Sequence, residues 1–170
     1  LPQTPLGRLA VLGNHDYGAG WQHGRVANRF VDELQRVDVR MLRNEATDVG
    51  GLQIAGTDDL WSGNLDWEQT LGQLRSAEPA IVLCHNPDAV DLPELQGFRG
   101  WVLAGHTHGG QCKPPFLPPP ILPVENRRYV AGEYDIGPGR RLYINRGLGY
   151  LRRVRFNARP EITLLTLARA

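Results

Sequence analysis

The chain has 170 residues, of which 41% are hydrophobic and 22% are charged, and its formal net charge is +1. This length is enough for one domain with its own core, and the composition excludes a disordered, collagen-like or coiled-coil protein. No run of 18 apolar residues occurs, which excludes a membrane span within these residues. The two cysteines, Cys84 and Cys112, do not make a disulfide framework.

In the first half of the chain, short apolar runs alternate with amphipathic patterns. Runs that stop at glycine indicate buried strands, and apolar residues spaced three and four apart indicate helices. The predicted strands are 8–12, 39–42, 49 and 52–55, with Gly50-Gly51 as a hairpin turn, and the predicted helices are 22–37 and 67–74.

The second half is richer in strands. The predicted strands are 80–84, 101–104, 129–134, 141–145 and 162–167, with one or two helical turns over 91–98. Residues 112–123 contain six prolines and predict a rigid loop. Strand–helix units followed by a strand-rich tail predict a single α/β domain over residues 1–170, with a mixed sheet.

Charge is distributed unevenly along the chain. Residues 127–159 hold nine arginines against Glu133 and Asp135, a net charge of +7, while the remainder carries −6. A cationic segment on a near-neutral domain indicates an anionic partner such as a phosphorylated substrate, a nucleic acid or a lipid headgroup. A solvated arginine-rich surface explains the pattern equally well, because Lys113 is the only lysine.

Three predicted strands end in residues that can carry out chemistry. Gly13-Asn14-His15-Asp16 follows the first strand, His85 follows strand 80–84, and Gly105-His106-Thr107-His108 follows strand 101–104. Sites in open α/β sheets gather at the carboxyl ends of strands. We therefore expect these side chains to meet at one edge of the sheet.

The residue types in these motifs favour a metal site. Two imidazoles separated by one residue in a glycine-rich loop, His106 and His108, can face a Zn, Fe or Mn type of ion. Asn14 offers an amide oxygen to a hard cation. His15 beside the carboxylate of Asp16 is typical of a general acid or base.

In this order the motifs resemble the calcineurin-like metallophosphoesterase superfamily, whose pattern ends in Gly-Asn-His-Asp/Glu, a lone His and Gly-His-x-His. The resemblance is closest to the bacterial branch that includes the YkuE and YaeI proteins. It covers nearly the whole chain, including Gly105 to Gln111, Arg146 to Gly149 and the tail from Arg155 to Leu165. It implies a sandwich of mixed β-sheets flanked by helices, and hydrolysis of phosphomonoesters or phosphodiesters.

The resemblance also implies roles for individual residues. Asn14, His85 and His106 would hold the second of two divalent metal ions (Mn, Fe or Zn), and His108 would belong to the first. A metal-bridging hydroxide would attack phosphorus, and His15, oriented by Asp16, would protonate the leaving group. The expected substrate is a phosphate-ester small molecule or a lipid-linked phosphate ester, in preference to nucleic acid.

The chain departs from the family at its start. It contains no Asp-x-His and no Gly-Asp dipeptide, the elements that supply two aspartates and a histidine to the metals. We therefore expect an N-terminally truncated domain, whose 170 residues alone are inactive or nearly so. A cytoplasmic, membrane-associated or exported location of the parent would depend on the missing N-terminus.

Two other functions fit parts of the sequence. In a mononuclear zinc protein, His85, His106 and His108 would form a three-histidine site, which accounts for the missing aspartates but leaves residues 13–16 unused. A non-catalytic module would use the basic tail to bind nucleic acid or an anionic membrane, without metal and with steep salt dependence.

Three further features are interpreted as structural. Thr57-Asp58-Asp59 follows a strand and predicts a turn or capping role. Trp61 and Trp67 are expected to pack in the core or a lid. Cys112 is read as a packing residue and not as a metal ligand.

Overall fold

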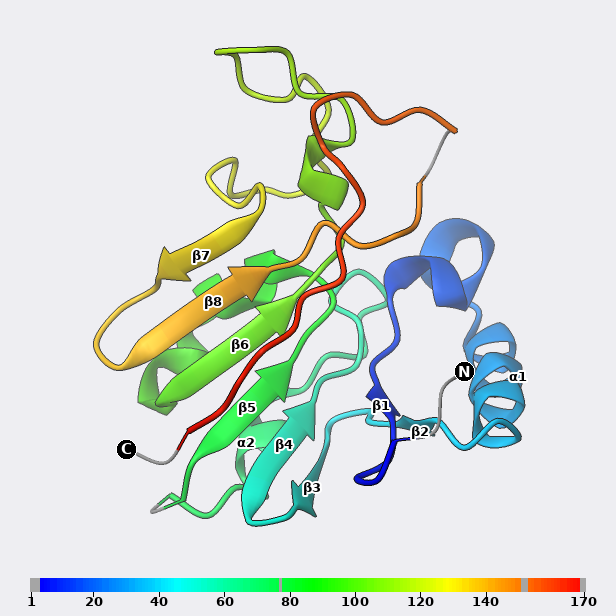
Figure 1. Cartoon of the computed structure of the whole chain (residues 1–170). Coiled ribbons are helices and arrows are strands. Elements are labelled where there is room, and N and C mark those ends of the chain that lie inside the picture. Colours follow the sequence, from blue (N-terminus) through cyan, green and yellow to red (C-terminus); the bar gives the residue numbers. More distant parts are fainter. Residues whose placement is uncertain (1–3, 77, 151–152, 169–170) are drawn as a thin grey trace.

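Six strands form one mixed sheet in the computed structural model, which describes residues 4–76, 78–150 and 153–168 (Figure 1). Their order across the sheet is β3-β4-β5-β6-β8-β7. The four inner strands are parallel, and the edge strands β3 and β7 are antiparallel to their neighbours. The bounds are β3 Glu45–Val49, β4 Leu52–Gly56, β5 Ala80–Leu83, β6 Gly100–Ala104, β7 Gly132–Asp135 and β8 Arg140–Ile144. The predicted α/β class with a mixed sheet is confirmed.

One row of side chains across the inner strands forms the centre of the core. Ala55, Val82, Val102 and Leu142 lie opposite one another in register, and each is fully buried. The α2 helix (Trp67–Leu71) and the 3-10 turns Pro87–Asp91 and Pro93–Gly97 supply the other buried members of this cluster. The opposite face of β5 and β6 is less buried, since Leu83 and Leu103 are half-buried and Trp101 is 36% exposed.

A second, smaller cluster packs beside β4. The two-residue strands β1 (Leu9–Ala10) and β2 (Arg40–Met41) pair in parallel, and α1 (Gly24–Gln35) connects them. The segments around β1 and β2 approach the main sheet closely at Gly56 of β4. A Cβ atom at Gly56 would lie 2.5 Å from Cβ of Leu42 and 2.7 Å from Cγ1 of Val11. Figure 1 shows α1 and this small sheet next to the β3–β4 end of the main sheet.

Most predicted elements are present, with shifted ends. The helix predicted over 22–37 is α1, and the Gly50-Gly51 turn joins the antiparallel pair β3 and β4. Residues 112–123 contain no helix or strand, as predicted, apart from a single bridge between Cys112 and Phe156.

Two strand predictions need correction. The strand predicted over 8–12 is only β1, because hydrogen bonding to the short β2 ends at the carbonyl of Ala10, which accepts from the amide of Leu42. The strand predicted over 162–167 is absent. Instead, Thr163 contacts Asn145 of the chain after β8 through a side-chain hydrogen bond of 2.7 Å. Its neighbours Ile162 and Leu164 remain 82% and 92% exposed.

Candidate metal centre

All six predicted site residues line one cavity of about 450 Å³. Asn14, His15 and Asp16 lie in the 3-10 turn Asn14–Tyr17 that follows β1. The other three site residues, His85, His106 and His108, follow the carboxyl ends of the neighbouring parallel strands β5 and β6. Parallel strands end at the same edge, which is why the histidines meet there. The lining consists of Gly13, Asn14, His15, Asp16, Trp21, Trp61, His85, His106, His108 and Pro123.

One imidazole nitrogen in this cavity lies close to two other possible metal-ligand atoms. Nε2 of His85 lies 3.2 Å from Oδ1 of Asn14 and 3.0 Å from Nδ1 of His106. Two ligand atoms bound to one ion at about 2.1 Å lie roughly 3.0 to 3.4 Å apart at right-angled or tetrahedral geometry. Without a metal ion, Nε2 of His85 could donate only one hydrogen bond, although both Asn14 Oδ1 and His106 Nδ1 lie within hydrogen-bond distance of it. The donor set therefore fits a divalent cation of the borderline class.

Burial keeps the two converging imidazoles neutral. It lowers the pKa of His85 to about 3, with the nearby His106, His108 and His15 acting in the same direction. It lowers the pKa of His106 to about 4, against the opposing effect of the Pro123 backbone. Both rings are therefore unprotonated at neutral pH, which is the form that binds a metal ion.

A glycine makes room for the His85 ring. A Cβ atom at Gly13 would lie 2.7 Å from both Cε1 and Nε2 of His85. The backbone φ of Gly13 is −110°, which any residue can adopt, so the constraint is one of space. The glycine that precedes Asn14 thus lets the β1 loop touch the imidazole after β5.

The loop after β6 holds its two histidines in an unusual backbone conformation. His106 and His108 have φ values of +66° and +52°, which non-glycine residues rarely adopt. The hydroxyl of Thr107 fixes the loop by donating to the carbonyl of Val130 at 2.7 Å. As a result His106 turns toward His85, while Nδ1 of His108 lies 3.3 Å from Oε1 of Gln111.

The three-histidine zinc site is not assembled. Over residues 4–76, 78–150 and 153–168, no three His, Cys, Asp or Glu side chains are arranged to hold a metal ion. The side chains that lie within ligand distance of His85 are Asn14 and His106, and His108 lines the same cavity.

His15 and Asp16 are placed differently from each other. The His15 ring lines the cavity and meets the Trp21 ring edge-on, with centroids 6.2 Å apart. The carboxylate of Asp16 accepts a 2.8 Å hydrogen bond from the amide of Gly13, and burial raises the pKa of this carboxyl. Asp16 therefore closes the turn that carries Asn14, and its carboxylate bonds to the Gly13 amide and not to His15 within the described residues.

Two tryptophans were missed as parts of the site. Trp61 stacks on Trp21 with centroids 4.7 Å apart and meets His106 edge-on at 4.5 Å. Trp67, which the sequence grouped with Trp61, is a core residue whose Nε1 donates to the carbonyl of Ala89 at 2.9 Å. No sequence signal separates the two, because both follow the same strand within a few residues.

The aspartates after β4 have the predicted turn role. Oδ1 of Asp59 accepts from the amide of Ser62 at 2.9 Å. Asp58 accepts from the hydroxyl of Tyr17 and, at 2.9 Å, from Nε of Arg43, which ties the turn carrying Asn14 to the main sheet. Oδ2 of Asp59 is buried and has no hydrogen-bond partner among the described residues, and burial raises the pKa of this carboxyl to about 6.

Comparisons with known proteins find several similar sequences. The chain is 40% identical over 174 residues to the uncharacterized metallophosphoesterase YkuE of Bacillus subtilis, covering 96% of this chain and 57% of YkuE. It is 37% identical over 166 residues to the phosphodiesterase YaeI of Escherichia coli, covering 94% of this chain and 57% of YaeI. It is 27% identical over 213 residues to the UDP-2,3-diacylglucosamine pyrophosphatase LpxG of Chlamydia trachomatis, covering 95% and 64%.

The chain thus spans less than two thirds of the length of these relatives. No protein-family model matches it. No solved structure matches it.

Proposed function

We propose that this chain, which belongs to the calcineurin-like metallophosphoesterase superfamily and within it to the branch of YkuE and YaeI, forms part of the active site of a metal-dependent phosphoesterase. The observation that carries the proposal is the position of His85 Nε2, which lies 3.2 Å from Asn14 Oδ1 and 3.0 Å from His106 Nδ1. Relatives named metallophosphoesterase, phosphodiesterase and pyrophosphatase support the reaction class.

Asn14, His85 and His106 would hold one of two divalent ions, and His108 would contribute to the other. Mn, Fe and Zn all suit this mixture of imidazole and amide donors. When bound, such ions polarise phosphoryl oxygens and make a hydroxide nucleophile available near neutral pH. The neutral state of His85 and His106 leaves both nitrogens free to bind without first losing a proton.

The other residues of the cavity would act on the substrate. His15 would donate a proton to the departing oxygen, a contribution of about 10²- to 10⁴-fold in rate. Asp16 would hold the turn that carries His15 through its bond to Gly13. The stacked pair Trp21 and Trp61 would form an apolar wall that keeps water from the scissile bond.

We further propose that these 170 residues bind one ion weakly and turn over little substrate. They contain neither Asp-x-His nor Gly-Asp, so the carboxylates that the family pattern supplies to both ions are absent. A single ion held by an amide and two imidazoles lacks the second ion that stabilises the other side of an in-line displacement.

Metal stoichiometry tests the site. Equilibrium dialysis against Mn²⁺ or Zn²⁺ followed by elemental analysis should give one ion per chain. His85→Gln should weaken binding at least tenfold, because it removes the central donor. His23→Gln is the matched control, since His23 is an exposed residue at the start of α1 and should leave binding unchanged. Equal binding by both variants would refute the site.

Turnover tests the reaction. A chain that extends to the full length of the relatives should hydrolyse bis(p-nitrophenyl) phosphate only with added metal, and its His15→Asn variant should lose rate with metal binding intact. Failure of that longer protein to hydrolyse any phosphate ester would refute the phosphoesterase. Robust turnover by the 170 residues alone would refute the need for further carboxylates.

A further inference from the structure

Two loops project beyond the carboxyl ends of β5, β6 and β8, at the same end of the sheet as the metal centre (Figure 1). We call residues 113–121, 147–150 and 153–159 the two-loop surface. The loops are joined at their bases, where the amide of Phe156 donates to the carbonyl of Gln111 and the amide of Lys113 donates to the carbonyl of Phe156, both at 2.9 Å. The surface is therefore one structural unit.

The two-loop surface exposes large apolar side chains. Phe116 is fully exposed, and Ile121 is 75% exposed. Leaving such side chains in water costs about 1.5 to 3 kcal/mol each relative to burial, and clustered exposed apolar groups mark interaction sites. The exposed members are Phe116, Leu117, Ile121, Leu148, Tyr150, Val154 and Phe156.

The same surface is strictly cationic. No acidic residue occurs in 105–124 or in 137–160. Lys113, Arg153 and Arg159 are exposed, and no ion pair involves them within the part of the chain that the structure describes. Apolar side chains flanked by arginine and lysine are typical of surfaces that enter the headgroup layer of anionic membranes.

A hollow between the loops lies beside the segment that carries His108. It has a volume of about 680 Å³ and is lined by Pro115, Arg146, Arg155, Phe156, Asn157 and Arg159. Arg155 fixes its wall, since Nη1 donates to the carbonyl of His108 at 3.4 Å and Nη2 to the carbonyl of Arg146 at 2.9 Å. A group held by this surface would therefore lie next to the loop that carries the metal-binding histidines.

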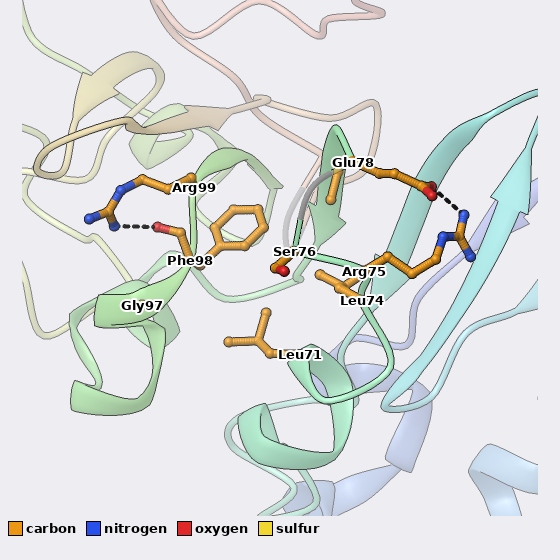
Figure 2. Close-up of a pocket in the computed structure, with 9 residues that line it drawn as sticks. Leu71, Leu74, Arg75, Ser76, Glu78, Gly97, Phe98 and Arg99 are labelled. Atoms are coloured by element: carbon orange, nitrogen blue, oxygen red, sulfur yellow. Dashed lines mark hydrogen bonds and ion pairs between the residues drawn. The ribbon is translucent and has the colours of Figure 1, made fainter.

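Another hollow of the protein lacks this combination. It lies at the amino end of β5, with an apolar floor that includes Leu71 and Phe98 (Figure 2). Its arginines are already engaged: Arg75 pairs with Glu78, and Arg99 donates to the carbonyl of Phe98 at 2.9 Å. Free cations and exposed apolar tips thus occur together at the two-loop surface and not in this second hollow.

We propose that the two-loop surface binds the headgroup layer of an anionic phospholipid bilayer, with Phe116 and its apolar neighbours inserted and the arginines paired with lipid phosphates. Given the proposed phosphoesterase function, this contact would turn the metal centre toward phosphate esters that reside in the membrane. Among the described residues, none of the helices could span a bilayer.

Vesicle flotation tests the contact without any turnover. The chain, with metal removed by chelator, is mixed with vesicles of equal parts phosphatidylglycerol and phosphatidylcholine or of phosphatidylcholine alone, and centrifuged through a density gradient. Aggregated protein sinks, whereas vesicle-bound protein floats. The chain should float with the anionic vesicles only, and high salt should release it.

Matched variants separate the two parts of the surface. Arg153→Gln should weaken binding about fivefold, whereas Arg29→Gln, an exposed arginine on α1, should not. Phe116→Ser should weaken binding further, whereas Leu164→Ser, at a side chain that is 92% exposed elsewhere, should not. Neither loop substitution removes a buried contact, so both variants should fold.

Three outcomes would overturn the proposal. They are equal flotation with neutral vesicles, no difference between each loop variant and its control, and a Phe116-dependent dimer without flotation, which would assign the surface to a second copy. Because no metal is present, a negative result would leave the phosphoesterase proposal standing. If the chain floats but a longer protein hydrolyses no phosphate ester, the membrane proposal would stand and the phosphoesterase proposal would fall.

Discussion

The buried carboxyl of Asp59 offers a sharp test of the structure. Asp59 is fully buried, and burial raises its pKa from the ordinary 3.8 to about 6. At about 1.4 kcal/mol per pH unit, this difference opposes folding by up to roughly 3 kcal/mol above pH 6. Between pH 3.8 and 6 the cost grows, and below 3.8 it vanishes, because the carboxyl is then protonated in both the folded and the unfolded chain.

Asp59→Asn should remove this cost while keeping the 2.9 Å bond from the Ser62 amide through its remaining oxygen. We expect the variant to be about 1 to 3 kcal/mol more stable than the parent at pH 7, measured by urea unfolding. The advantage should shrink steadily from pH 6 to pH 4. The control is Asp66→Asn, at an exposed carboxylate that caps α2 through a similar bond to Gln69. Lower stability of Asp59→Asn at pH 7, or an advantage independent of pH, would refute the reasoning.

Two further substitutions test how the candidate metal centre is held together. Gly13→Ala should weaken metal binding at least tenfold, because its Cβ would lie 2.7 Å from the His85 ring, whereas Gly24→Ala, with open space around it, should bind metal normally in the same dialysis. Arg43→Met should lower the free energy of unfolding by about 2 kcal/mol, since it leaves the carboxylate of Asp58, 4% exposed, without its cation. A loss below about 0.5 kcal/mol would show that solvent satisfies this carboxylate.

Local patterns predicted most of the secondary structure because they are short-range. The apolar runs that became β5 and β6, the Gly50-Gly51 turn and the amphipathic face of α1 each follow from a few neighbouring residues. The tail over 162–167 shows the limit of such patterns. Its alternation suits a strand, but it equally suits an extended segment whose Thr163 contacts the chain after β8 while Ile162 remains in solvent.

The sequence by itself determined which donors the site has, one amide and several imidazoles, and that each follows a predicted strand. Only the tertiary structure decided that Nε2 of His85 lies between Asn14 and His106, that Trp61 lines the cavity while Trp67 does not, and that Asp59 is buried. The physical reason is that the order of strands across a sheet depends on backbone pairing and side-chain packing between distant segments. A residue's own neighbours in the chain contain no record of those contacts.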